Sequence, residues 1–269
     1  MERKINYLSV CYILALILMF ISGFFGGFWS EVVYYLVFLL PTVLGLLLDK
    51  QRPFGDAELF AIKTKDIRVL FPLILPTIFI VMLTSFITSI IIFTLTGAEN
   101  SVDVGDSLIP ALISHALVPA LFEEILFRYL PMKLLAGESK RVTVLASAIF
   151  FALAHHNLFS IPYAFLAGII FMAIDVSTNS IIPSILIHFI NNAISVGMLV
   201  YEDNAAFTPT LFTILAVLLV ISIAYILKRK EAYIDEIKRI FKKDRSVVYT
   251  LPFKIFIVIS LFVAVITLS

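Results

Sequence analysis

Long apolar segments, separated by short polar connections, make up most of the chain. Hydrophobic residues occupy 61% of its 269 positions and charged residues only 14%, whereas about half of an ordinary soluble domain is apolar. An apolar segment of about 17 to 25 residues is long enough to cross a bilayer as a helix. Nine candidate segments are present, at 5–27, 31–48, 69–96, 108–135, 142–157, 161–176, 180–200, 210–227 and 251–269. The sequence therefore predicts an all-α, polytopic transmembrane helix bundle of about eight to nine spans, with residues 1–269 forming a single membrane domain.

The connections between the apolar segments differ in their content of basic residues. A cytoplasmic N-terminus makes the connections 49–68, 136–141, 177–179 and 228–250 cytoplasmic. Every Lys and Arg except Arg128 then lies in or beside a cytoplasmic segment, as the positive-inside rule requires, while the outer connections carry acidic residues and no basic ones. This pattern predicts a multi-pass protein of the cell membrane with its N-terminus in the cytoplasm.

Net charge and cysteine content exclude several classes of protein. The formal net charge is +1, which gives no reason to expect nucleic acid as a partner. The single cysteine, Cys11, has no partner for an intrachain disulfide or for a cysteine-based zinc site, and we expect it to be a small core residue. The apolar segment 5–27 is longer than the core of a signal peptide, so it is interpreted as an uncleaved first helix.

The basic cytoplasmic loop 228–250 has a second possible role. Within 228–245, Ile234, Ile237 and Phe241 follow helical spacing beneath a basic face. Such a segment is typical of an interfacial helix on the anionic inner leaflet. A solvated loop that only fixes the orientation of the chain explains the charges equally well.

Six polar side chains in the apolar segments stand out, because hydrocarbon would reject them. They are Glu123, Glu124, Arg128, His155, His188 and Asn192. A charged side chain at the bilayer centre costs roughly 2.5 to 3.5 kcal/mol, so such groups pair inside a bundle and commonly mark a functional site. Two acids, two histidines and an amide indicate proton-transfer chemistry.

Helical geometry divides these residues into groups. Glu124 and Arg128 are four residues apart, in the order that favours an ion pair. Glu123 is turned by roughly 140° from Arg128 and is left available for other chemistry. His188 and Asn192 share a face. At 1.5 Å per residue the groups lie at similar depths in the inner half of the membrane, except that His155 is somewhat high unless its helix is short, tilted or broken.

Three chemistries fit these residues. In the first, Glu123 is a general base, oriented by His155, for a water that attacks a peptide carbonyl, and His188 and Asn192 donate hydrogen bonds to the oxyanion. In the second, Glu123, His155 and His188 bind a zinc ion with an open position for water. In the third, the acids and histidines relay protons in a transporter. Composition and spacing do not choose among them.

The order of the motifs resembles a known family. Glu123 to Arg128 follows a Glu-Glu-x-x-x-Arg pattern, Phe151 to His155 follows Phe-x-x-x-His, and His188 to Asn192 follows His-x-x-x-Asn. Together, and in this order on apolar helices, these motifs resemble the CPBP (or Abi) family of intramembrane proteases, which process CAAX prenyl proteins and bacteriocins. The resemblance covers about 108–195, which is interpreted as the catalytic core. The turn before the third motif, often glycine-containing in the family, is Ser-Thr-Asn here, and Asn179 tolerates left-handed geometry.

The resemblance implies the first of the three chemistries. Glu123 would activate water, His155 would assist, and His188 with Asn192 would stabilise the oxyanion, while Glu124 and Arg128 support them. No cofactor is expected, although zinc stays open. The expected partners are the lipid bilayer and a peptide or membrane-protein substrate: a prenylated CAAX tail, a leader or pheromone-type peptide, or a transmembrane segment. A non-catalytic self-immunity protein or regulatory scaffold of the same fold is the alternative.

Neighbouring polar residues are given structural roles. His156 and Asn191 point about 100° away from the motif residues beside them and are interpreted as packing or loop groups. His115 is assigned to structure or to support of the site. Asp175, near the cytoplasmic end of its segment, is expected to be interfacial.

Overall fold

The computed structural model describes residues 1–22, 24–25, 28–50, 57–61, 63–97, 104–105, 107–242 and 251–266. Helices dominate this part of the chain, and no strand occurs in it, which confirms the predicted all-α class. The elements in order are α1 (Glu2–Ser22), α2 (Phe28–Leu48), the 3₁₀-helix η1 (Ala57–Phe60), α3 (Thr64–Thr96), α4 (Leu108–Leu112), the π-helix η2 (Ile113–Leu117), α5 (Val118–Glu124), the π-helix η3 (Ile125–Tyr129), α6 (Leu130–Leu134), α7 (Lys140–Ala154), α8 (Ile161–Thr178), α9 (Ile182–Val200), α10 (Phe207–Lys228), α11 (Lys230–Ile240) and α12 (Leu251–Ile266).

Each of the nine apolar segments contains a helix. Six helices are long and apolar enough to cross a membrane: Glu2–Ser22, Phe71–Thr96, Leu108–Leu134, Ile161–Thr178, Ile182–Val200 and Phe207–Lys228. Two further helices, within α2 and α12, are shorter and apolar, and α7 has 15 residues. These helices indicate a multi-pass membrane protein, while the count of eight to nine spans and the orientation stay predictions. Residues 23, 26–27 and 267–269, at the ends of two predicted spans, lie outside the described residues.

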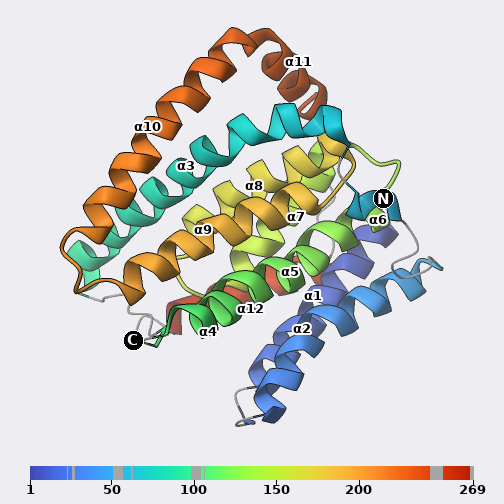
Figure 1. The fold of residues 1–269 in the computed structure, drawn as a ribbon. Helices are drawn as coiled ribbons and strands as arrows, with labels where there is room; N and C mark the ends of the chain where they lie inside the picture. Colours follow the sequence, from blue (N-terminus) through green and yellow to red (C-terminus); the bar gives the residue numbers. More distant parts are fainter. Residues whose placement is uncertain are drawn as a thin grey trace.

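The α7–α8 hairpin, with α9, forms the centre of the bundle (Figure 1). Helix α3 packs against α8 and α9 on one side, and α10 packs on the outer side of α3; α1 and α2 pair on the opposite side of the bundle (Figure 1). Gly168 allows α8 to approach α7 closely, because a Cβ there would lie 2.8 Å from Ala148 Cα. Cys11 is fully buried, as predicted.

The predicted cytoplasmic connections gather at one end of the bundle, the end at which the N-terminus lies in Figure 1. The Lys4 Nζ atom donates to the Ala136 carbonyl at 3.2 Å, and the Ile181 N–H donates to Leu59 O at 2.9 Å. Asn179 has a φ of 54°, the predicted left-handed conformation of the turn between α8 and α9. Residues 51–56, 62 and 243–250 of these connections lie outside the described residues.

The amphipathic segment after α10 forms the helix α11. Its Ile240 is buried with Val144 of α7 and Met172 of α8. Ile234 and Ile237 stay exposed, which leaves them available to an interface. The helix is thus confirmed, whereas its position on the membrane surface stays a prediction.

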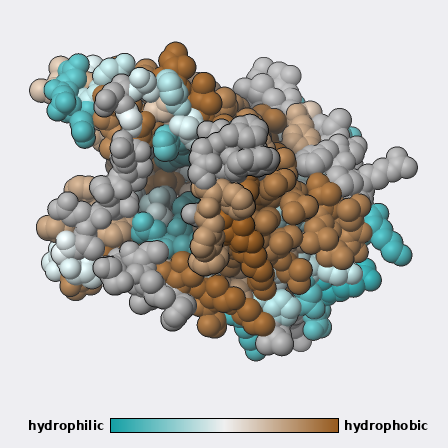
Figure 2. Space-filling view, turned by 90° about the horizontal axis from the view of Figure 1, so that it is seen from below, coloured by the Kyte–Doolittle hydropathy of each residue, from teal (hydrophilic) through white to brown (hydrophobic). Residues whose placement is uncertain are grey.

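Apolar side chains also cover much of the outside of the bundle. Figure 2 shows one face on which they dominate, with hydrophilic side chains mainly at the periphery and in one hollow. Large exposed apolar residues such as Phe20, Phe71 and Leu95 each expose more than two thirds of their surface. Apolar patches of this extent are uncommon on soluble monomers, and here they fit contact with lipid.

Candidate active site

Two π-helical turns interrupt the helix that carries the first motif. In η3 the N–H of Leu130 bonds to Ile125 O, five residues back, rather than to Leu126 O. The next residue that would donate is Pro131, which has no N–H, so the carbonyl of Phe127 also lacks its helical partner. Single π-turns of this kind are frequent at functional sites.

Side chains from other helices satisfy these two carbonyls. Tyr12 of α1 donates its hydroxyl to Leu126 O at 3.2 Å. Ser147 of α7 donates its hydroxyl to Phe127 O, and Arg128 Nη1 donates to the same oxygen at 3.3 Å. The π-turn is therefore tied to α1 and to α7, and these contacts fix the direction of the motif side chains.

Glu124 and Arg128 form the predicted ion pair. The Glu124 Oε2 atom lies 3.2 Å from Arg128 Nε, and both side chains are fully buried. The guanidinium group also lies over the ring of Phe151, 4.4 Å from its centroid, and 5.6 Å from the centroid of Phe171. Since a buried charge is costly unless it is paired, this arrangement anchors the motif helix against α7 and α8.

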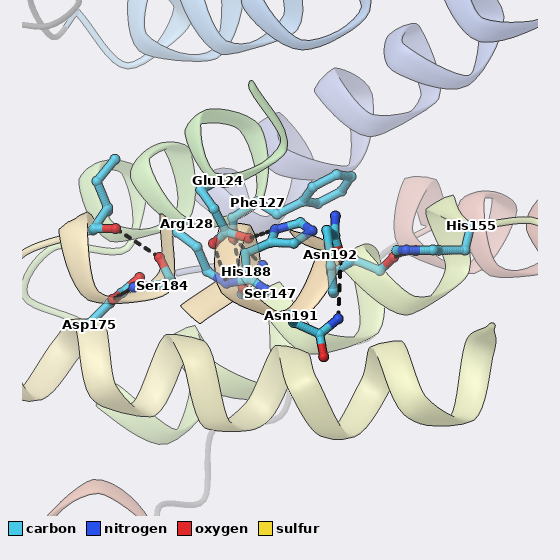
Figure 3. Close-up of polar contacts among 12 residues, drawn as sticks. Glu124, Phe127, Arg128, Ser147, His155, Asp175, Ser184, His188, Asn191 and Asn192 are labelled. Carbon is cyan, nitrogen blue, oxygen red and sulfur yellow. Dashed lines mark hydrogen bonds and ion pairs between the residues drawn. The ribbon is translucent and has the colours of Figure 1, made fainter. Parts of the chain in front are cut away.

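His188 joins the same cluster, an arrangement that the sequence reasoning missed. Its Nδ1 atom lies 2.8 Å from Glu124 Oε1, and Figure 3 shows its ring pointing at this carboxylate. The helical spacing paired His188 with Asn192 and gave Glu124 only to Arg128. Residues 124 and 188 lie on different helices, so no periodicity in the sequence could have shown that they meet.

Asp175 corrects a second expectation. We expected an interfacial residue, but its side chain is fully buried. The Asp175 Oδ1 atom accepts a hydrogen bond from the backbone N–H of Ser184 at 3.2 Å (Figure 3). Ser184 lies in the first turn of α9, where helical N–H groups have no partner in their own helix. Asp175 thus fixes the start of the helix that carries His188 and Asn192.

His155 lies at the end of α7, just after Ala154. It therefore begins the connection to α8, and its depth in the membrane stays a prediction. The His155 Nδ1 atom lies 2.8 Å from Phe151 O, and since a carbonyl only accepts, Nδ1 carries the proton. In the neutral ring Nε2 is then an acceptor. Figure 3 shows His155 apart from the pair of Glu124 and His188, with Asn192 between them.

All four predicted catalytic residues line one cavity of about 800 Å³. Glu123, His155, His188 and Asn192 contribute to it, together with Asn191. We call these five residues the polar wall. The cavity is also lined by apolar side chains of α3 and α10, which we call the apolar wall: Leu75, Ile78, Phe79, Met82, Leu83 and Phe86 of α3, and Phe212, Leu215, Ala216 and Leu219 of α10. The structure therefore brings the predicted residues together at a cavity that has a polar wall and an apolar wall.

Asn191 and His115 also line this cavity, which the sequence reasoning did not expect of Asn191. The Asn191 Nδ2 group donates to Asn192 Oδ1 at 3.2 Å. This contact occupies the acceptor of the Asn192 amide and leaves its Nδ2 group as a donor. His115 is exposed at the cavity margin. The repeated Asn at 191–192 was the only signal in the sequence for a role of Asn191.

The alternative zinc site does not fit the arrangement of these side chains. No three His, Cys, Asp or Glu residues within the described part of the chain are placed so that they could hold a metal ion. The set of Glu123, His155 and His188 shares a cavity without forming a ligand group. Independence from cofactors stays a prediction.

Comparison with known proteins agrees with the family that the motifs predict. Residues 105–194 match the family model described as type II CAAX prenyl endopeptidase Rce1-like. No curated protein and no solved structure matches the chain. The matched segment contains all six motif residues and covers about a third of the chain. The predicted resemblance is therefore confirmed for this segment, which is similar to a family of proteases.

Proposed function

We propose that the chain is a CAAX-type intramembrane endopeptidase, which hydrolyses a peptide bond near the cytoplasmic face of the membrane with a water activated by Glu123. The main support is that Glu123, His155, His188 and Asn192 line one cavity in a bundle of apolar helices. Amide hydrolysis by water needs a base and donors for the developing oxyanion, and these residues supply both. The similarity of residues 105–194 to CAAX prenyl endopeptidases supports the same reaction.

Glu123 and His155 act on the water. The Glu123 carboxylate takes one proton, and the water oxygen attacks the carbonyl carbon of the peptide. His155 accepts a hydrogen bond from the same water through Nε2, because its Nδ1–H donates to Phe151 O. Two acceptors at fixed positions orient the attacking lone pair toward the carbonyl.

Asn192 and His188 stabilise the negative charge that forms on the carbonyl oxygen. The Asn192 Nδ2 group donates to this oxygen, since Asn191 occupies Oδ1. Doubly protonated His188 donates from Nε2 while its Nδ1–H stays bonded to Glu124. Glu124 and Arg128 position His188 and do not touch the substrate.

Collapse of the tetrahedral intermediate completes the reaction. Glu123, now a carboxylic acid, gives its proton to the leaving nitrogen as the C–N bond breaks. The immediate products are a carboxylic acid and an amine, and Glu123 returns to its charged form. The acid then passes its proton to the amine, which gives a carboxylate and an ammonium group. Proposed substrates are a prenylated CAAX tail, a leader-type peptide or a transmembrane segment, whose apolar part would contact the apolar wall.

The decisive experiment compares Glu123→Gln with the parent chain in liposomes, with farnesylated CAAX-type peptides and unmodified hydrophobic peptides as substrates. Glutamine keeps the size of the side chain but cannot take a proton, so we expect cleavage to fall by about 10²–10⁴-fold. The matched control is Glu58→Gln, at an exposed glutamate of η1. Cleavage by Glu123→Gln at the rate of the parent would refute the proposal.

Two further measurements separate the alternatives. Activity that survives strong chelation supports hydrolysis without zinc, and activity that is lost and then restored by zinc would establish the metal-dependent version. For the scaffold alternative, membranes containing the parent and Glu123→Gln are compared by proteomics. Identical peptide profiles with an unchanged cellular phenotype would favour a non-catalytic role.

A further inference from the structure

A second, smaller cavity lies beside Glu123 and His155. Its volume is about 220 Å³, and these two residues line it as well as the larger cavity. His188, Asn191 and Asn192 line only the larger one. Glu123 and His155 therefore stand at the boundary between two spaces, and a peptide bond placed at this boundary has room on both sides.

The walls of the smaller cavity are apolar and tightly buried. They come from α1, α2 and α12 as well as from the motif helix, and Ala15, Val37, Phe38 and Phe256 each expose less than 5% of their surface. Apart from Glu123 and His155, Tyr12 is the only polar side chain among the described residues that line it. Its hydroxyl is already engaged with Leu126 O.

Away from Glu123 and His155, the size and the chemistry of this space fit a side chain better than water. A buried water needs two to four polar partners, whereas an apolar cavity of about 150 Å³ is known to stay dry and to bind benzene. A cavity of about 220 Å³ can therefore hold the side chain of leucine or phenylalanine. The larger cavity, open to α3 and α10, can hold the rest of the substrate.

We propose that the smaller cavity is a specificity pocket, which takes one large aliphatic or aromatic side chain from a residue adjoining the cleaved bond. This inference rests on the proposed function, because it uses the position of Glu123 and His155 as the point of cleavage. Ala15 of α1 and Met19, one turn further along, set the size of the pocket. Neither residue lines the larger cavity.

The test uses one variant that fills the pocket and another that enlarges it. Ala15→Leu adds bulk inside it and Met19→Ala removes bulk, while Ala224→Leu makes the same change as the first at an exposed position of α10. The full chain in liposomes is given farnesylated and unmodified CAAX-type peptides. In the farnesylated peptides the residue after the modified cysteine is Gly, Ala, Leu, Phe or Trp in turn. In the unmodified peptides the same replacements are made on each side of the cleaved bond, and kcat/KM is measured for each peptide.

We expect the parent and Ala224→Leu to prefer Leu or Phe at one of the two positions. Ala15→Leu should lower kcat/KM for those peptides by about 10- to 200-fold, the range for small volume changes in apolar pockets, and leave the Gly and Ala peptides little changed. Met19→Ala should move the preference toward Trp.

The outcomes separate the pocket from the proposed function. If the parent cleaves and Glu123→Gln does not, the proposed function is supported. The dependence of kcat/KM on side-chain size then tests the pocket by itself. The pocket would be refuted if Ala15→Leu changed kcat/KM equally for all peptides or for none of them, and if Met19→Ala kept the size preference of the parent. If Ala15→Leu does not fold, the Met19→Ala profile decides. A parent that cleaves no peptide overturns the function and the pocket together.

Discussion

The polar wall and the apolar wall enclose the same cavity but are held in different ways. Behind the polar wall, Glu124 and Arg128 are fully buried and bonded across helices. On the α10 part of the apolar wall, no lining residue is buried, and Phe212 exposes 48% of its surface. Groups that act on a bond need fixed positions, whereas a wall that admits an apolar substrate from the bilayer gains from weak packing.

The largest effect is expected from a variant that removes the support of the polar wall. Arg128→Met removes the charge that pairs with Glu124 and keeps an apolar side chain of similar length. Removing one partner of a buried ion pair costs about 3–5 kcal/mol, because the other charge is left uncompensated. We therefore expect a large loss of stability, measured by thermal or denaturant unfolding in detergent micelles, and loss of any peptidase activity.

Two variants serve as controls for this prediction. The double variant Glu124→Gln with Arg128→Met removes both charges and should recover part of the stability. Glu123→Gln should leave stability within about 0.5 kcal/mol of the parent, since Glu123 is half-buried and has a chemical role. A stable Arg128→Met chain would show that the pair does not support the wall.

The next effect concerns one donor on the polar wall. Asn192→Ala removes the proposed oxyanion contact, so kcat should fall by about 10²–10³-fold with little change in KM. Asn191→Ala should lower kcat less, because Asn192 keeps its amide and loses only the contact at 3.2 Å that orients it. Steady-state kinetics on one cleaved peptide measures both. A loss confined to KM would assign Asn192 to substrate binding instead.

The smallest effect belongs to the apolar wall. Leu219→Ala should change stability by no more than about 0.5 kcal/mol, since α10 is mostly exposed and its apolar groups lose little by facing lipid. KM for an apolar substrate should rise by about 10-fold, because Leu219 lines the cavity. The neighbouring Val220→Ala, at a residue that exposes 67% of its surface, should leave KM unchanged. A large loss of stability in Leu219→Ala would remove the contrast between the walls.

Most of the helices could be predicted because lipid leaves the backbone few alternatives. Each apolar segment must satisfy its N–H and C=O groups within itself, so length and apolarity alone indicate a helix. The short helix before His155 and the left-handed turn at Asn179 were also indicated by local sequence. The pair of Glu124 and Arg128 followed from a spacing of four residues, which is a property of one helix.

The sequence by itself determined the helical class, the motif residues and the pairing within one helix, because these depend on periodicity and apolarity along the chain. Only the tertiary structure decided which helices meet: that His188 binds Glu124, that buried Asp175 holds the start of α9, and that Glu123 and His155 stand between two cavities. Contacts between helices depend on packing and on carbonyls released by π-turns, and neither leaves a periodic trace in the sequence.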